Sequence, residues 1–205
     1  MLAAVMFALT LAIFLLLAWH VRKSNRNIRS NYEVLAAKFG LQLDASRKVG
    51  VTLHPSVAGV YRGRETQVAT LLRRRGRALT RVTVAKLKPA APSFSVRWHG
   101  RVRPSPDQTP VETRDAEFDR ELRVTSSDPE RLRAALNADR RAGLRAFLRA
   151  RRDGEFIGTD QALHYEEDLI VHTDAKRVRI ESVVGFLHDL ASALEGGSPG
   201  PGTSA

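Results

Sequence analysis

Residues 2–19 read LAAVMFALTLAIFLLLAW, and this stretch decides how the chain is organised. Thr10 is its only polar residue. As a helix the stretch would be roughly 27 Å long, which matches the hydrocarbon core of a bilayer. A buried core helix is the alternative at this length, but a run at the end of the chain that is apolar on every face argues against it. The sequence therefore predicts a transmembrane anchor over residues 1–21.

Positive charge lies on one side of the apolar run. Trp19 ends the run, and its amphipathic ring favours the level of the lipid headgroups. The basic residues that follow, and that we expect at the membrane interface, are Arg22, Lys23, Arg26 and Arg29. Because Lys and Arg accumulate on the cytoplasmic side of membrane helices, this asymmetry predicts a single-pass protein of the inner membrane whose remaining residues are cytoplasmic.

A cleaved secretory signal is the competing interpretation of the same run. Signal peptides carry basic residues before the apolar stretch and small residues just before the cleavage site. Here the leading residues are uncharged, and the run ends in Leu16-Leu17-Ala18-Trp19, which is a poor cleavage site. We therefore expect the segment to be retained, with residues 22–30 as a basic juxtamembrane linker.

Charge is distributed unevenly along the 205 residues, whose net charge is +11. Residues 1–114 contain 20 Lys and Arg against 5 Asp and Glu, whereas residues 115–205 contain 13 against 17. The basic first part suggests an anionic partner, either lipid or nucleic acid. A GC-rich genome would also explain why only 6 of the 33 basic residues are Lys, but not the asymmetry. The chain has no cysteine, which excludes disulfides, thiolate metal sites and thiol nucleophiles.

The pattern beyond the anchor predicts a cytoplasmic α+β domain over residues 31–195, built of antiparallel strands packed on two or three helices. A helix is expected over residues 31–38, either continuing the membrane helix or turning away from it, and Gly40 is its expected C-cap. The first group of expected strands is 57–61, 66–72, 79–87 and 94–98. Prolines at 104, 106 and 110 mark a loop that could separate lobes 31–103 and 115–195.

The second part of the domain shows clearer start signals. A strand is expected over residues 121–125, and Asp128-Pro129-Glu130 then predicts the start of a helix that reaches residue 151. Three further strands are expected over 155–159, 162–165 and 169–173. Asp174 is the expected cap of a last helix over 175–195, and the Gly/Pro/Ser-rich residues 196–205 predict a disordered tail.

Three sequence patterns carry a resemblance to known proteins. They are Gly59-x-Tyr61-Arg62-Gly63-Arg64, then Glu117-Phe118-Asp119-x-x-Leu122-x-Val124-x-Ser126-x-Asp128-Pro129, and then Ala162-Leu163-x-Tyr165 with Asp168-Leu169-x-Val171. Together they resemble a group of bacterial domains of unknown function that are often anchored by N-terminal membrane helices. The resemblance implies a bacterial membrane-tethered module and brings no catalytic residues with it.

The densest charge in the chain lies in the segment expected to form a hairpin tip. Its members are Arg73, Arg74, Arg75 and Arg77. One interpretation is a finger that touches anionic lipid headgroups, because each basic residue near an anionic surface contributes about 1 kcal/mol. The other is a solvated hairpin end whose like charges prevent edge-to-edge pairing of strands. The sequence leaves both open.

Chemical motifs are weak throughout the chain. His164 and His172 flank Glu166, Glu167 and Asp168, but a spacing of eight fits no helical or ribbon pair of metal ligands, so no metal or cofactor is expected. The carboxylates that could pair as acid and base in three dimensions are Asp119, Asp128, Glu166 and Glu167. No nucleophile elbow or phosphate-binding loop accompanies them.

The sequence therefore favours a non-enzymatic interaction or scaffold module tethered to the bilayer. Its basic half would face anionic lipid, and its acidic half would be free for an unknown protein partner. A membrane-bound enzyme and a nucleic-acid-binding protein are the alternatives. Nucleic acid is disfavoured because the aromatic residues, 6% of the chain, do not alternate with the arginines and no known nucleic-acid-binding signature is present.

Overall fold

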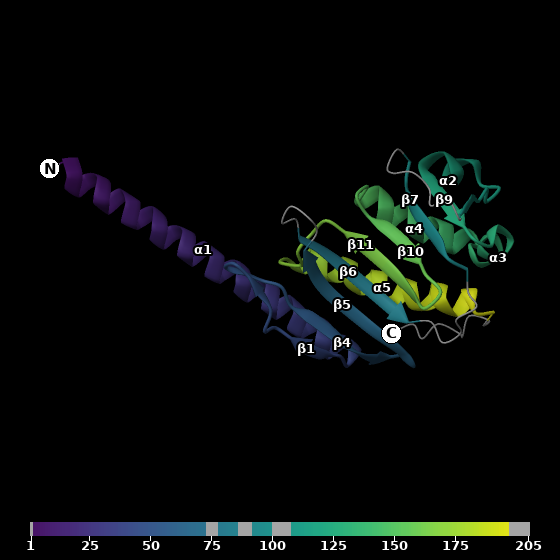
Figure 1. Ribbon diagram of the computed structural model, residues 1–205, viewed down its shortest axis with the longest axis horizontal. Coiled ribbons are helices and arrows are strands. Elements are labelled where there is room, and N and C mark those ends of the chain that lie inside the picture. The colour runs from purple at the N-terminus through teal and green to yellow at the C-terminus, as the bar shows by residue number, and fades with distance from the viewer. Residues whose placement is uncertain (1, 73–77, 86–91, 100–107, 197–205) are drawn as a thin grey trace.

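A computed structural model describes residues 2–72, 78–85, 92–99 and 108–196 (Figure 1). The arginine cluster Arg73, Arg74, Arg75 and Arg77 lies outside the described residues, as do the predicted strand end at residues 86–87 and nearly all of the predicted tail. The predicted class is confirmed: a long apolar N-terminal helix leads into a domain of antiparallel strands packed on helices.

The first helix, α1 (Leu2–Phe39), is uninterrupted. No Gly or Pro occurs between its ends, so nothing in the sequence breaks the backbone hydrogen bonding. The helix therefore continues through residues 22–30, and the prediction of a separate linker there is wrong. It ends at Gly40, whose φ of +66° is suited to glycine at a helix C-terminus. The segment Val5–Phe39 is long and apolar enough to cross a membrane.

One antiparallel sheet organises the domain, in the strand order β1-β4-β5-β6-β11-β10-β7-β9-β8. Its strands are β1 (Gln42–Asp44), β4 (Ser56–Tyr61), β5 (Arg64–Leu72), β6 (Ala78–Ala85), β7 (Phe94–Trp98), β8 (Thr109–Pro110), β9 (Leu122–Ser126), β10 (Glu155–Gly158) and β11 (Ala162–Glu167). Because β6 pairs with β11 and β7 pairs with β10, strands from both sides of the proline-rich loop share this sheet. The two lobes considered from the sequence therefore share this main sheet.

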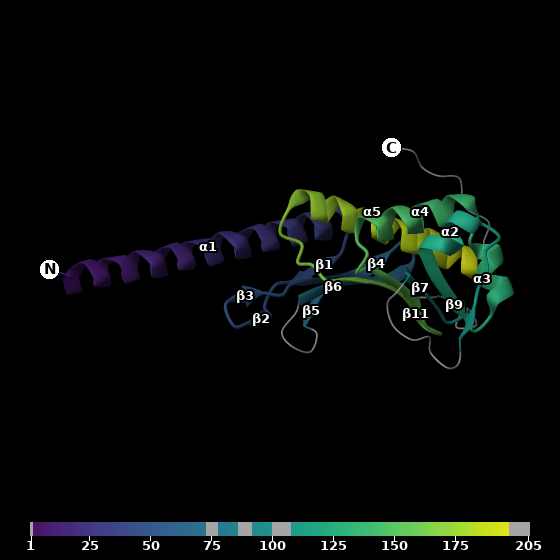
Figure 2. The ribbon, with the colours of Figure 1, turned by 90° about the horizontal axis from the view of Figure 1, so that it is seen from above.

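A small hairpin stands apart from the main sheet. It consists of β2 (Lys48–Val49) and β3 (Thr52–Leu53), which pair only with each other. Gly50 and Val51 form the two-residue turn between them, and the φ of Gly50 is +58°. Figure 2 shows this hairpin beside α1, reaching further toward the N-terminus of that helix than the main sheet does.

The helices differ from expectation at three places. The predicted helix over 129–151 is two helices, α3 (Pro129–Ala135) and α4 (Ala138–Ala150), because the side chain of Asn137 accepts the Arg140 backbone N–H and starts a new helix. A short helix that the pattern did not predict, α2 (Ala116–Glu121), precedes β9. The last helix, α5 (Asp174–Leu194), is capped by Thr173 and not by Asp174.

The strand predicted over residues 169–173 is also absent from the described structure. Both edges of β11 are already occupied, by β6 and β10, so no partner strand is left for this segment. Its backbone instead makes tight local hydrogen bonds, from Leu169 N to Glu167 O and from His172 N to Ile170 O. The alternation that suggested a strand reflects the burial of Leu169 and Val171 in the core.

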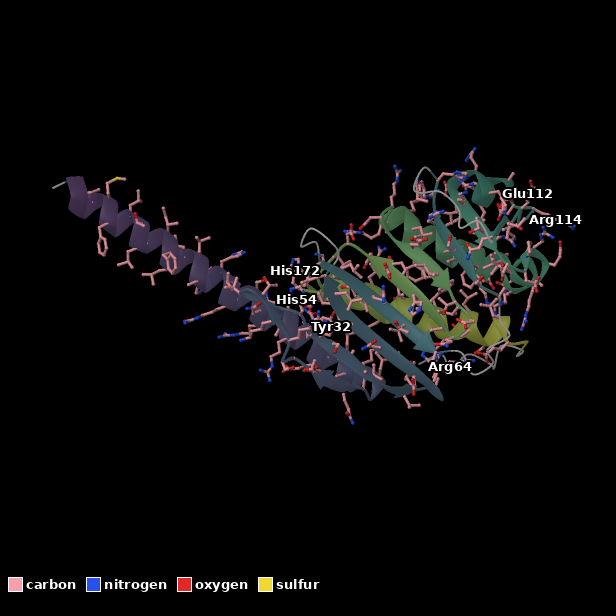
Figure 3. All side chains as sticks on the ribbon, in the orientation of Figure 1. Tyr32, His54, Arg64, Glu112, Arg114 and His172 are labelled. Atoms are coloured by element: carbon pink, nitrogen blue, oxygen red, sulfur yellow. The ribbon has the colours of Figure 1, made fainter. Side chains whose placement is uncertain are left out.

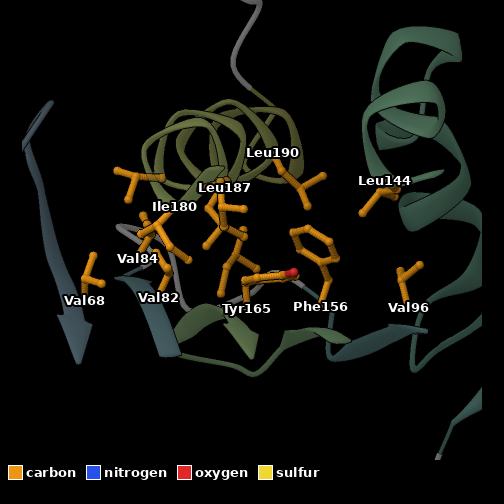
Figure 4. Close-up of a cluster of buried hydrophobic side chains, with 14 of the residues drawn as sticks. Val68, Val82, Val84, Val96, Leu144, Phe156, Tyr165, Ile180, Leu187 and Leu190 are labelled. Carbon is orange, nitrogen blue, oxygen red and sulfur yellow. The ribbon is translucent and has the colours of Figure 1, made fainter. Parts of the chain in front are cut away.

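Helices α2 to α5 and the end of α1 cover one face of the sheet (Figure 2). Along each central strand alternate residues point to that face, and α5 lies across them. Figure 4 shows this layer, in which Val82, Tyr165 and Phe156 from the sheet face Leu187 and Leu190 of α5. The side chains of all five are almost fully buried.

In the folded domain, the basic and the acidic parts of the sequence are not separated into two halves. Arg64, Arg81 and Lys38 from the basic part pair with Glu195, Glu166 and Glu181 from the acidic part, at 2.7, 2.5 and 2.8 Å. Since strands of both parts share one sheet, charges of opposite sign from the two parts pair within the domain. Among the described residues, Arg22, Lys23 and Arg26 stand exposed where α1 leaves the domain.

Candidate membrane-proximal surface

The end of α1 that meets the domain carries the predicted interface residues. The Lys23 ammonium lies 4.9 Å from the centre of the Trp19 ring, a cation–π contact that places aromatic ring and charge at one level. Arg22 and Arg26 are exposed beside them. Arg29 pairs with Glu33 at 2.9 Å, so it adds less net charge than its neighbours. The residues predicted at the membrane interface thus lie on one stretch of helix, and the charge of Arg29 is partly neutralised.

The next turns of α1 are built into the domain. Ile28, Tyr32, Leu35 and Phe39 recur every three or four residues, which places them on one face of the helix, and all four are buried. The Tyr32 hydroxyl lies 2.8 Å from Thr70 Oγ1 of β5, and burial raises the pKa of this phenol to about 12. Ile28 follows Trp19 by only nine residues, or roughly 14 Å along the helix axis. The domain core therefore begins within about three helical turns of Trp19, the residue expected at the headgroup level.

Asn25 fixes the β2–β3 hairpin to this part of α1. Its side-chain amide donates to the Val51 carbonyl at 2.8 Å, and its Oδ1 accepts the Leu53 backbone N–H at 3.0 Å. Figure 3 places His54, just after the hairpin, and His172, just before α5, at the end of the domain from which α1 leaves, whereas Glu112 and Arg114 lie at the opposite end. Sequence reasoning missed this hairpin; its signal was the short alternating run around Gly50.

A second surface lies on the face of the sheet that the helices do not cover. Strands β1, β4, β5 and β6 form an open depression of about 530 Å³ there. Its lining residues are Gln42, Ala58, Gly59, Val60, Glu65, Thr66, Gln67, Thr83 and Ala85. Val60 of β4, beyond the end of the edge strand β1, is a large apolar side chain that is 66% exposed. This face is suited to a contact with another molecule.

The histidines and carboxylates considered as a metal cluster do not come together. Adjacent residues of a strand point to opposite faces, so Glu166 pairs with Arg81 on the open face while Glu167 points into the core. His164 lies on the open face beside Thr83, with the two polar atoms 3.1 Å apart, and His172 is exposed in the loop before α5. In the described parts of the chain, no group of three or more metal-binding side chains is assembled.

The other candidate acids have structural roles. The Asp119 carboxylate accepts the backbone N–H and the hydroxyl of Thr113, which fixes the approach to α2. Asp128 caps α3 by accepting the Arg131 N–H, as the sequence predicted. These two carboxylates are thus engaged at α2 and α3, whereas Glu166 and Glu167 lie on β11.

A buried polar network, missed by sequence reasoning, surrounds Glu167. The Tyr165 hydroxyl donates to Glu167 Oε2 at 2.9 Å, and the guanidinium groups of Arg179 and Arg151 lie 3.1 and 3.8 Å from the same oxygen. Burial raises the pKa of Glu167, and the nearby arginines oppose that effect. Arg179 thereby joins β11 to α5, and the Glu167 side chain has no exposed surface.

Comparison with known proteins gives a likeness of fold. No protein-family profile matches the sequence, and no curated protein is significantly similar to it. Among solved structures, the chain is similar to the crystal structure of the mycobacterial trehalose monomycolate transport factor A, TtfA, with a TM-score of 0.60 and 13% sequence identity. The match covers 88% of this chain and 99% of that one. The arrangement of helices and strands described above therefore occurs in a mycobacterial transport factor.

Proposed function

We propose that this chain is a membrane-tethered, non-enzymatic interaction module that holds a protein partner at the cytoplasmic face of a bacterial inner membrane. The observation that carries the proposal is the continuity of α1. Its first half is apolar and exposed on all sides, and its second half supplies core residues of the domain. A helix built in this way ties the position of a folded domain to the bilayer.

The likeness to TtfA supports a role alongside lipid transport. That protein is described as a trehalose monomycolate transport factor. The described residues of our chain contain one helix of membrane-spanning character, and a single helix has no room for a transport path of its own. We therefore infer that any part in transport is exercised through a partner that forms the path, with this domain as an accessory.

The open sheet face is the surface on which we place that partner. The helices cover the opposite face, and the depression beside Val60 offers apolar and polar atoms together. A photoreactive amino acid at Val60, in the full chain in intact membranes, is expected to cross-link to a membrane protein. The matched control is Val178 on α5, which is 51% exposed but on the helical side. Adducts that are equal at both positions, or absent at Val60, would exclude this face.

Orientation is tested separately with a reporter at the C-terminus that is active only outside the cytoplasm. We expect it to be inactive, and strong activity would overturn the cytoplasmic placement.

Lipid contact by Arg73, Arg74, Arg75 and Arg77 stays a prediction. It is favoured because β5 ends and β6 begins at the end of the domain nearer the apolar segment (Figure 1). Changing all four to Glu should then weaken association of the domain with anionic bilayers.

A further inference from the structure

We propose that the β2–β3 hairpin, residues 47–54, is a second membrane contact that rests on the anionic headgroups beside α1. We call it the foot. This assignment depends on the proposed membrane insertion of α1. It gives a partner, an anionic lipid surface, to an element for which the sequence suggested no role. Three independent observations carry it: the position of the foot, its exposed apolar tip and its unpaired positive charge.

The position of the foot follows from Asn25. This residue comes six positions after Trp19, so it lies roughly 9 Å further along the helix axis. The headgroup layer on each side of a bilayer is roughly 5–8 Å thick. Asn25 therefore stands just outside that layer, and its two hydrogen bonds hold Val51 and Leu53 at the same height. Because Val51 belongs to the turn, the tip of the hairpin stands at the edge of the headgroup layer, closer to the N-terminus of α1 than the main sheet does (Figure 2).

The tip of the foot carries an exposed apolar side chain. Val51 is 68% exposed, more than any other large apolar residue that the structure describes outside the apolar run of α1. In contrast, Leu53 on the neighbouring strand is buried at 5% exposure, and the His54 N–H donates to the Arg47 carbonyl to close the hairpin. The hairpin is thus well fixed, and the exposure of Val51 is a consequence of its geometry.

The base of the foot is positively charged. Arg47 and Lys48 are exposed, and within the described part of the chain neither pairs with a carboxylate. The nearest acid in the sequence, Asp44, accepts hydrogen bonds from the backbone N–H and hydroxyl of Ser46. Arg22, Lys23 and Arg26 of α1 add charge of the same sign at this level. The exposed Val51 at the tip and the basic residues at the base are together suited to an anionic bilayer surface. There the valine can contact the apolar boundary while the basic residues contact anionic headgroups.

The test uses the full chain in nanodiscs and exploits its lack of cysteine. A spin label is attached at Val51→Cys, at Val60→Cys as an equally exposed control, or at Leu11→Cys within the apolar run. In discs containing phosphatidylglycerol, the label at 51 should be more accessible to oxygen, and less accessible to a water-soluble nickel chelate, than the label at 60. Each basic residue near an anionic surface changes binding about fivefold, so Arg47→Glu with Lys48→Glu should return the label at 51 to water.

The outcomes separate the foot from the anchor. A label at 11 that is exposed to the nickel chelate would refute the membrane insertion of α1, and with it the proposed function. A label at 11 inside the bilayer, together with labels at 51 and 60 that are equally accessible to the nickel chelate, would refute the membrane contact of the foot alone. Protection at 51 that survives the double charge reversal, or that occurs equally in detergent through contact with a second copy, would also refute it.

Discussion

At the scale of single residues, the packing between β10 and β7 leaves no room for a side chain at Gly158. A Cβ atom built there would lie 2.3 Å from Cε1 of Phe94, the residue opposite it in the sheet. Gly158→Ala should therefore lower the free energy of unfolding by about 1–3 kcal/mol, because the aromatic ring must move in a packed core. Denaturant unfolding of the full chain in detergent measures it.

Gly185 provides the matched control. It lies inside α5, and a Cβ atom there meets nothing within 4 Å. Gly185→Ala should raise the free energy of unfolding by about 0.5–1 kcal/mol, since alanine loses less backbone freedom in a helix than glycine does. Equal effects of the two substitutions, in sign and size, would contradict the close approach of Phe94.

His188 makes stability depend on pH. Burial, together with the charges of Arg62 and Arg64, lowers the pKa of this imidazole to about 4. The unfolded chain has a pKa of about 6.5 at this residue, so between pH 6.5 and 4 it binds a proton that the folded protein does not. The free energy of unfolding should therefore fall by about 1–2 kcal/mol from this residue as the pH drops from 7 to 5.

Unfolding of His188→Gln at the two pH values isolates this contribution. The amide of Gln can still meet the Thr66 hydroxyl, which lies 3.0 Å from His188 Nε2, but it carries no proton in this range. Part of the loss in the free energy of unfolding at pH 5 should disappear in this variant, and an unchanged loss would contradict the contribution of His188. His54, whose pKa is also lowered by burial and by Arg47, keeps its own contribution in this variant.

At the scale of elements, the break between α3 and α4 depends on one cap. The Asn137 side chain accepts the Arg140 N–H at 2.9 Å and so satisfies a backbone group that α4 would otherwise leave unpaired. Asn137→Ala should lower the free energy of unfolding by about 1 kcal/mol, while Asn137→Asp, another good cap, should retain nearly all of it. A continuous helix over 129–151 would instead tolerate or favour alanine, and thermal unfolding of the two variants distinguishes the cases.

The same elements show what the sequence can and cannot predict. Apolar periodicity predicted the central strands, and Asp128-Pro129 predicted the start of α3, because both signals are local. The break at Asn137 was also encoded locally, but the apolar spacing on either side obscured it. In contrast, no local signal could reveal that Leu169 and Val171 lie in an irregular segment, since this depends on β6 and β10 occupying both edges of β11. The candidate surfaces are less predictable still, because the depression beside Val60 joins residues of four strands.

At the scale of the whole molecule, we expect α1 to make the apolar segment and the domain one rigid body, because the helix is uninterrupted. It spans 38 residues, or roughly 57 Å, and its second half is held by buried side chains. Without a flexible linker, a tilt of the helix in the bilayer tilts the sheet by the same angle. Under the proposed function, partner and membrane would therefore be presented to each other in one orientation, which a domain on a loose tether could not provide.

This rigidity predicts the distance distribution between spin labels at Leu11→Cys and Val178→Cys in the full chain, which has no native cysteine. Pulsed electron resonance in nanodiscs should give one narrow distribution. Insertion of Gly-Ser-Gly after Lys23 should broaden it, because glycine interrupts the helix where no packing supports it. Insertion of three alanines should keep it narrow and move the domain roughly 4.5 Å along the helix axis. A native distribution as broad as that of the glycine insertion would mean that the anchor and the domain move independently.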